Sequence, residues 1–184
     1  MNVIDILLIL MLFAAIAIGF FQGTIKLLIA TMAFYVSIVL ASLYFQMLGR
    51  FFRDRMGTTL SVGQVTAFAI ILVFGFVLLT IAGLYTFRYA RIPPSLDLID
   101  KVAGTLVGLV LGALAIGMTC AMLQALFVYQ NPAALLSWPL MRGLQSGVRG
   151  SVLVAFFADN ILPLIFQTVR PLLPNEADLI FRLR

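Results

Sequence analysis

The sequence predicts an all-α integral membrane protein with four transmembrane helices, followed by a C-terminal amphipathic helix at the membrane interface. Of its 184 residues, 63% are apolar and 10% are charged, whereas soluble domains have about 45–50% and about 25%. Four segments, residues 3–24, 25–48, 65–87 and 102–129, are long and apolar enough to cross a hydrocarbon core of roughly 30 Å. The lipid bilayer is therefore the first partner of this chain.

Connections between the segments set the expected organisation. Residues 22–24 alone separate the first two segments, which allows only a tight helical hairpin and predicts antiparallel neighbours. Charged residues in 49–64, and charged residues with prolines in 88–101, predict solvated loops. We expect two parts: a four-helix transmembrane domain over residues 1–129, and a proline-interrupted tail at the membrane surface over residues 130–184.

The tail segment 151–170 is expected to lie along the membrane and not to cross it. Asp159 falls at the middle of an apolar stretch, where a carboxylate at span depth costs about 2.5–3.5 kcal/mol. Pro163 removes a backbone donor and kinks any helix there. Asp159, Asn160, Gln167 and Arg170 share one helical face, which an interfacial helix turns to water.

Composition excludes several classes of function. The net charge is +5, but the Lys and Arg residues flank apolar runs and do not gather on one solvated face, which argues against nucleic acid as a partner. The chain has no histidine, and its single cysteine, Cys120, lies inside an apolar run. No carboxylate at span depth is available to activate a nucleophile. We therefore expect no enzyme, no cofactor and no metal site.

Two helix starts carry carboxylates in the position that favours a helix N-terminus. Asn2 is followed three residues later by Asp5, and Ser95 by Asp97 and Asp100. Both patterns predict capping of the helix that follows them.

Glycines spaced by four residues form the strongest local motif. Gly104, Gly108 and Gly112 lie on one face of the fourth segment, and Gly19 and Gly23 form a second pair in the first. Such faces let another helix approach to backbone contact. Plain helix packing is one reading; a glycine-lined surface that opens into a conduit in an oligomer is the other.

Two motifs carry a resemblance to a known family. The first motif begins with Val3-Ile4-Asp5 and continues to Gly19-Phe20-Phe21-Gln22-Gly23 and Lys26. The second begins with Ile99-Asp100-Lys101 and continues to Gly104, Gly108 and Gly112, which we call the glycine ladder. Together they resemble the colicin V production proteins over residues 2–174. That family usually has arginine at the position of Gln22 and often a basic residue at that of Leu111.

The resemblance implies a small multi-pass protein of the bacterial inner membrane, not an enzyme. Its implied role is in production or export of a secreted peptide toxin, or in envelope homeostasis. Self-association through the glycine faces would give a channel-like oligomer; alternatively, the same faces bind another membrane protein and the chain is a scaffold or accessory subunit of a larger complex.

Charge near the span ends does not settle the orientation. Some relatives in the resembled family carry a trypsin-like protease on the outer face after the last span. We expect no protease here, and by this likeness we expect both termini outside.

Overall fold

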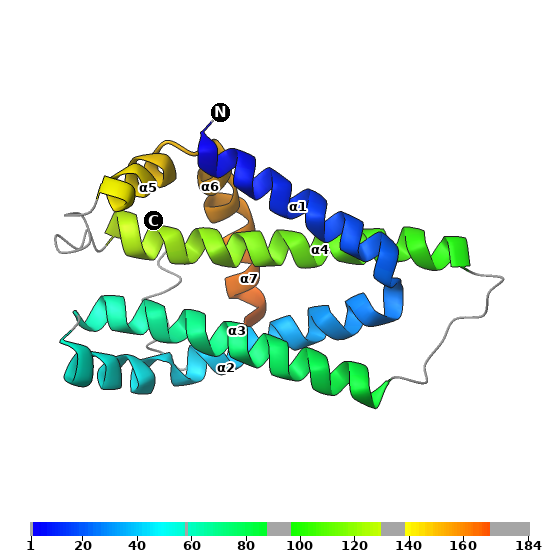
Figure 1. Cartoon of the computed structure of the whole chain (residues 1–184), viewed down its shortest axis with the longest axis horizontal. Coiled ribbons are helices and arrows are strands. Elements are labelled where there is room, and N and C mark those ends of the chain that lie inside the picture. The colour runs from blue at the N-terminus through cyan, green and yellow to red at the C-terminus, as the bar shows by residue number, and fades with distance from the viewer. Residues whose placement is uncertain (1, 58, 88–96, 130–138, 170–184) are drawn as a thin grey trace.

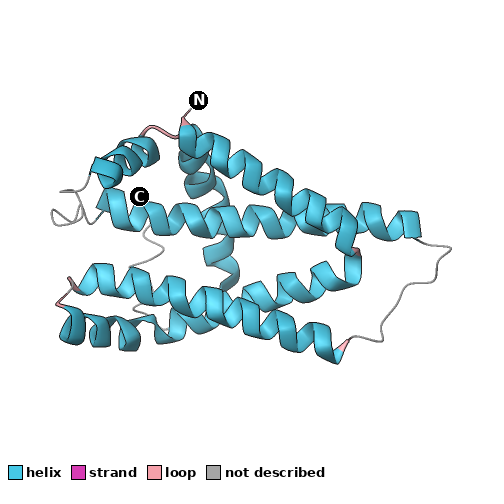
Figure 2. Cartoon of the chain, in the orientation of Figure 1, coloured by secondary structure: helices cyan, strands magenta, loops and turns pink. Residues whose placement is uncertain are grey.

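The computed structural model describes residues 2–57, 59–87, 97–129 and 139–169, and every regular element in these ranges is helical. Four long helices come first: α1 (Val3–Gln22), α2 (Thr24–Met56), α3 (Leu60–Thr86) and α4 (Asp97–Gln124), which the π-helical turn η2 (Ala125–Tyr129) continues (Figure 1). Figure 2 shows how little loop joins the described helices. Each long helix is long and apolar enough to cross a membrane, so the predicted fold class is confirmed.

Helix α2 is longer than the sequence predicted. It continues past residue 48 through Arg50, Arg53 and Arg55, so the predicted solvated loop over residues 49–64 is wrong. Hydropathy marks where a chain leaves the hydrocarbon, but charged residues do not end a helix. Gly57 ends it with a left-handed φ of 64°, and arginines in the last turn complement the helix dipole.

The four long helices form two pairs. α1 packs along α4 and α2 packs along α3, while α4 also contacts α2 between the pairs (Figure 1). α1 and α2 diverge from the turn at Gly23 and make few contacts with each other, so the prediction that they are neighbours is wrong. A short connection fixes where two helix ends meet; the side chains decide which faces pack.

Two apolar clusters hold the pairs together. The first joins α2, α3, α4 and the tail. Its buried members are Phe34, Ile38, Ala41, Phe45, Phe68, Leu72, Met118, Ala121 and Leu162. The second joins α1, α4 and the tail. Its buried members are Ile4, Leu8, Ile116, Cys120, Phe127, Val148, Val154 and Phe157.

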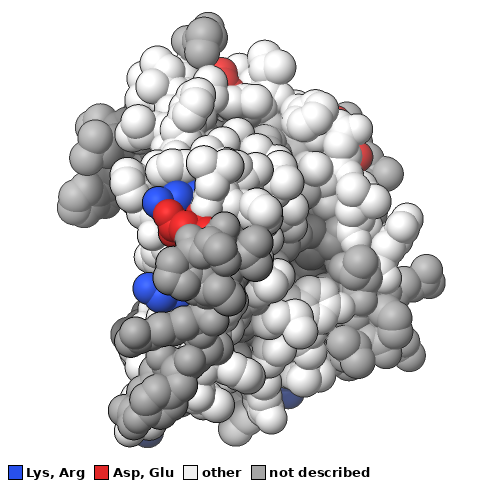
Figure 3. Space-filling view, turned by 90° about the vertical axis from the view of Figure 1, so that its right-hand side faces the viewer, with Lys and Arg blue, Asp and Glu red and all other residues white. Residues whose placement is uncertain are grey.

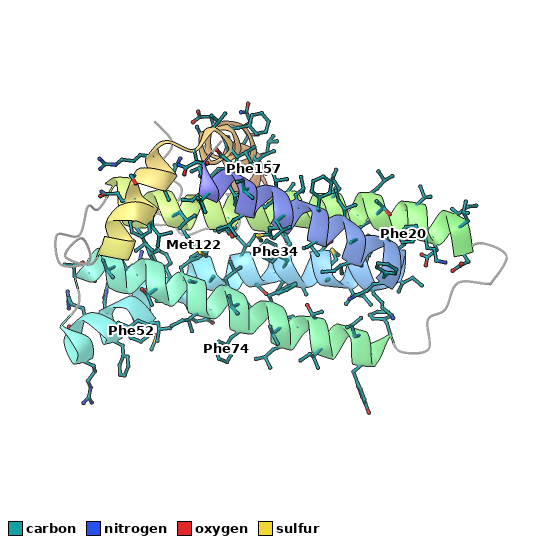
Figure 4. All side chains as sticks on the ribbon, turned by 45° about the horizontal axis from the view of Figure 1, so that its top comes forward. Phe20, Phe34, Phe52, Phe74, Met122 and Phe157 are labelled. Carbon is teal, nitrogen blue, oxygen red and sulfur yellow. The ribbon has the colours of Figure 1, made fainter. Side chains whose placement is uncertain are left out.

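The outer surface of the spans is apolar. Figure 4 shows Phe74 directed away from α3, and its side chain is 65% exposed, whereas Phe34 is buried between the helices. Among the described residues on the face in Figure 3, charged side chains lie only in small groups. Large exposed apolar surface is unusual for a soluble monomer and is what a lipid-facing surface requires.

Between residues 139 and 169, the described part of the tail, lie four short helical elements: α5 (Pro139–Arg149), α6 (Val152–Phe156), the π-helical turn η4 (Phe157–Ile161) and α7 (Leu162–Val169). The π-turn ends two residues before Pro163, where the sequence predicted a kink. The Leu162 N–H donates to the carbonyl of Phe157, five residues back. The wider turn accommodates the proline ring, which would clash with a carbonyl in a regular α-helix.

The segment from α6 to α7 runs across the long helices and not alongside them (Figure 1). Val154, Phe157 and Leu162 are buried against the long helices, while Asp159 and Asn160 are exposed, as the amphipathic pattern predicted. Arg170 lies outside the described residues. α5 and the following helices together are apolar enough for a fifth span, but a bend of 53° separates them. The surface position of the tail therefore stays a prediction.

Cysteine labelling tests that position. In a Cys120→Ala background, we expect Val152→Cys, at a position that is 76% exposed, and Arg170→Cys to react from the same side of the membrane with a thiol reagent that cannot cross it. Labelling from opposite sides would mean that the tail crosses and that the chain has five spans.

Candidate functional site

The turn between α1 and α2 is built on Gly23. This residue has φ 76° and ψ 171°, a conformation that is essentially restricted to glycine. A Cβ atom at Gly23 would also collide with the Asp100 carboxylate, at the start of α4. The glycine therefore serves both the backbone turn and the close approach of a third helix.

Asp100, in the first turn of α4, caps the neighbouring helix α2. Its Oδ1 accepts a hydrogen bond of 2.7 Å from the Thr24 N–H, and its carbonyl accepts one of 2.8 Å from Thr24 Oγ1. These bonds satisfy a donor in the first turn of α2 and tie the turn to α4. Asp97 instead forms an exposed ion pair of 2.7 Å with Lys101. Ser95 lies outside the described residues.

The two glycine motifs pack against each other within the chain. A Cβ atom on Gly19 would lie 2.5 Å from the Gly104 carbonyl oxygen, and one on Gly108 would lie 2.7 Å from the Ala15 carbonyl oxygen. A Cβ atom on Gly112 would lie 2.8 Å from Ala15 Cβ. α1 and α4 are thus in backbone contact at Gly104 and Gly108, one turn apart, at a distance that only glycine permits.

The structure brings six of the eight predicted motif residues together at this contact. Gly19, Gly23, Asp100, Gly104, Gly108 and Gly112 form it. Lys26 is exposed in the first turn of α2 and makes no ion pair with a described residue. Asp5 lies at the other end of α1, in a second junction.

Substitution at the turn separates backbone strain from collision. Gly57, at the end of α2, is the reference for strain alone, because it has a left-handed φ and open space around it. We expect Gly57→Ala to lower the free energy of unfolding by about 1–2 kcal/mol. Gly23→Ala should cost about 1–3 kcal/mol in strain and, because the Asp100 carboxylate must move, about 1.5–3 kcal/mol more for the lost hydrogen bond. Unfolding by SDS titration in mixed micelles measures both. Equal losses would contradict the placement of Asp100.

The second junction joins the N-terminus of α1 to the tail. Asn2 and Asp5 form the predicted capping box: Asn2 Oδ1 accepts from the Val3 N–H at 2.9 Å, and Asp5 Oδ2 accepts from the Asn2 N–H at 3.0 Å. Asp5 is also buried against the tail. Its Oδ1 accepts from Ser151 Oγ at 2.5 Å and from the Leu153 N–H at 3.2 Å.

Ser151 completes this junction as the N-cap of α6. Its Oγ donates to Asp5 and accepts from the Val154 N–H at 3.1 Å. Asn2 Nδ2 donates to the Gly147 carbonyl at 2.8 Å, which adds the end of α5. One carboxylate therefore serves two helix N-termini, a favourable place for a negative charge. We call the set Asn2, Asp5, Gly147, Ser151 and Leu153 the Asp5 junction.

The polar groups inside the spans mostly bond within their own helices. Ser37, Thr105 and Thr119 each donate to the carbonyl four residues earlier, at 2.6–2.8 Å. In the described part of the chain no three His, Cys, Asp or Glu side chains gather as a metal site would require. The two junctions are contacts between helices, and their polar groups hold the helix ends together.

Comparison with known families decides the assignment. The family model described as colicin V production protein matches residues 4–163, which include the contact of α1 with α4 and all of the Asp5 junction except Asn2. The chain belongs to the colicin V production protein family. Comparisons with curated proteins and with solved structures gave no match. The family is not a known family of enzymes, and with four apolar helices the chain is a multi-pass membrane protein.

The glycines of the two resemblance motifs and Asp100 are parts of one contact, whereas Asp5 belongs to the second junction and Lys26 is exposed. Sequence reasoning missed Ser151 and Thr24, which complete the two junctions. Ser151 carried a weak signal, because serine before an apolar run is a common N-cap. Thr24 carried none, since its partner is far away in the sequence.

Proposed function

We propose that this chain is a non-enzymatic protein of the bacterial inner membrane that supports the production or export of a secreted peptide toxin, or the upkeep of the envelope. In this proposal it acts as an accessory subunit that binds a larger membrane complex. The family supports the broad role, and the packing of the glycine faces supports the mode of action.

The contact between Gly19, Gly104 and Gly108 carries this choice. A path lined by glycines needs those faces to be open, but the glycine faces of α1 and α4 pack against each other within one chain. Any association with another protein then uses a different surface. The exposed apolar side chains of α1 and α3 offer such surfaces.

Charge inside the spans points the same way. Residues 6–25, 27–49, 56–87 and 102–141 contain no Asp, Glu, Lys or Arg. Proton relays and charged-substrate paths in membranes are built from such groups. A chain without them is better suited to hold or position a partner than to conduct an ion by itself.

Purification from a mild detergent tests the proposal. We expect a tagged chain to bring down one identified membrane protein in stoichiometric amount, and a tagged four-span protein of another family to leave it behind. A homo-oligomer without a foreign partner would contradict the accessory role and favour a channel-like assembly.

Photo-crosslinking then locates the partner. A benzoylphenylalanine in place of Phe74, which is 65% exposed, or Phe13, which is 64% exposed, samples the outer faces of α3 and α1. The same group in place of the buried Phe68 is the control and should crosslink only within the chain. A partner captured from Phe68 but from neither outer position would contradict binding through the exposed faces.

A further inference from the structure

An apolar groove of about 400 Å³ runs along the outer face of the α2–α3 pair. Five side chains of α2 between residues 28 and 36 form one wall, and Leu79 and Gly83 of α3 form the other with Phe87, the C-cap of α3. Gly83 brings the two helices close, because a Cβ atom there would lie 2.5 Å from Ile29 Cγ2. Every side chain that lines the groove is apolar.

The groove opens to the outside of the molecule along two membrane-spanning helices. Met32 and Phe87, which line it, are 70% and 56% exposed. At this depth an occupant finds no hydrogen-bonding group on the groove wall, so it must be apolar along its length. A hydrocarbon chain meets that condition without leaving any polar group unsatisfied.

The side chain of Lys26 provides a positive charge at the N-terminal end of α2, where the groove ends. Residues 26, 29, 33 and 36 fall on one helical face, which places Lys26 one turn beyond Ile29 on the same stripe. Lys26 is exposed and makes no ion pair within the described residues. By contrast, Lys101 is paired with Asp97 and Arg53 with Asp54.

We propose that this groove binds one acyl chain of an anionic phospholipid, and that Lys26 binds the phosphate of its headgroup. The charge complementarity selects the occupant: an apolar helix of another protein would fill the groove but would leave Lys26 unused. Lysine near a span end extends its ammonium to the headgroup level, where anionic lipid is the natural counterion.

Quenching by brominated lipids tests this site in the full chain. In a Trp138→Phe background, Phe87→Trp places a fluorescent reporter on the groove wall. We expect acyl-brominated phosphatidylglycerol to bind about fivefold more tightly than the phosphatidylcholine of the same chains, the factor that one lysine contact supplies. Lys26→Gln should reduce this preference to about one.

Two controls distinguish a site from general attraction. Arg50→Gln removes the same charge from the opposite end of α2 and should keep the preference. A reporter at Phe74, which is exposed on α3 and does not line the groove, should show no preference. Equal binding of the two lipids at Phe87→Trp, or an unchanged preference in Lys26→Gln, would overturn the proposal, as would a reporter that neither lipid quenches.

A second measurement does not depend on the reporter. Native mass spectrometry of the unlabelled chain should find phosphatidylglycerol retained through detergent exchange, and less of it in Lys26→Gln than in Arg50→Gln. Equal retention in these two variants would contradict the assignment of Lys26.

Discussion

Gly108→Leu is expected to force α1 away from α4 and to cause a large loss of stability. Even a Cβ atom at this position would lie 2.7 Å from the Ala15 carbonyl oxygen and 3.0 Å from Gly19 Cα. Backbone atoms cannot rotate out of the way as a side chain does, so the two helices must separate. We expect the free energy of unfolding in mixed micelles to fall by about 3 kcal/mol or more, the upper end for overpacking.

Gly143→Leu is the matched control. Gly143 is also helical, but an added Cβ atom there meets nothing within 4 Å. We expect its midpoint of SDS unfolding to stay within the range of surface substitutions, about 0.5 kcal/mol. If Gly108→Leu were as stable as Gly143→Leu, the glycine ladder would not be a contact.

Asp5→Ala is expected to release the tail from the long helices. The carboxylate accepts hydrogen bonds from Asn2, Ser151 and Leu153, so its removal leaves three donors without that acceptor. Hydrogen exchange reports this directly, because an amide loses protection when its local structure opens. The amides of Leu153 and Val154 should exchange nearly as fast as unprotected ones, while those in the centre of α4 keep their protection.

Two further variants serve as a partial disruption of the junction and as a control. Ser151→Ala removes one donor to Asp5 together with the cap on Val154, so it should raise exchange in α6 but leave the Asn2 bond intact. Asp54→Ala removes an exposed carboxylate from α2, outside the junction, and should leave α6 unchanged. Protection of α6 that survives Asp5→Ala would show that apolar contacts alone hold the tail.

The sequence predicted the spans well because length and hydropathy are local properties. The glycine ladder was also visible, as was the capping box of Asn2 and Asp5. The partner of the ladder was not, because spacing identifies a face but not what covers it. Gly19 and Gly104 are 85 residues apart by their numbers, and only the three-dimensional structure shows that the two motifs meet.

The wrong predictions have related causes. The tight turn at Gly23 suggested that α1 and α2 are neighbours, but packing is decided by the face that allows the closest approach, and glycines give that to α1 and α4. The bond from the Thr24 N–H to Asp100 was not predicted, because spacing within one helix does not show a partner on another. The loop predicted after residue 48 was wrong because the point where the chain leaves the hydrocarbon was taken for the end of the helix.

An intrachain disulfide between α1 and α4 tests the central claim, that the glycine faces fill each other within one chain. Ala15→Cys and Gly112→Cys are combined in a Cys120→Ala background, where the Cβ atoms need to separate by only about 1 Å to reach disulfide geometry. A protease site inserted between α3 and α4 then allows the chain to be cut. Phe13→Cys, on the exposed side of α1, replaces Ala15→Cys in the control.

After oxidation and without reductant, we expect the uncut Ala15→Cys and Gly112→Cys chain to keep the mass of one chain. After cleavage its two fragments should stay joined, and those of the control should separate. A disulfide-linked product with the mass of two chains before cleavage would contradict the intrachain contact, because the glycine faces would then join separate molecules.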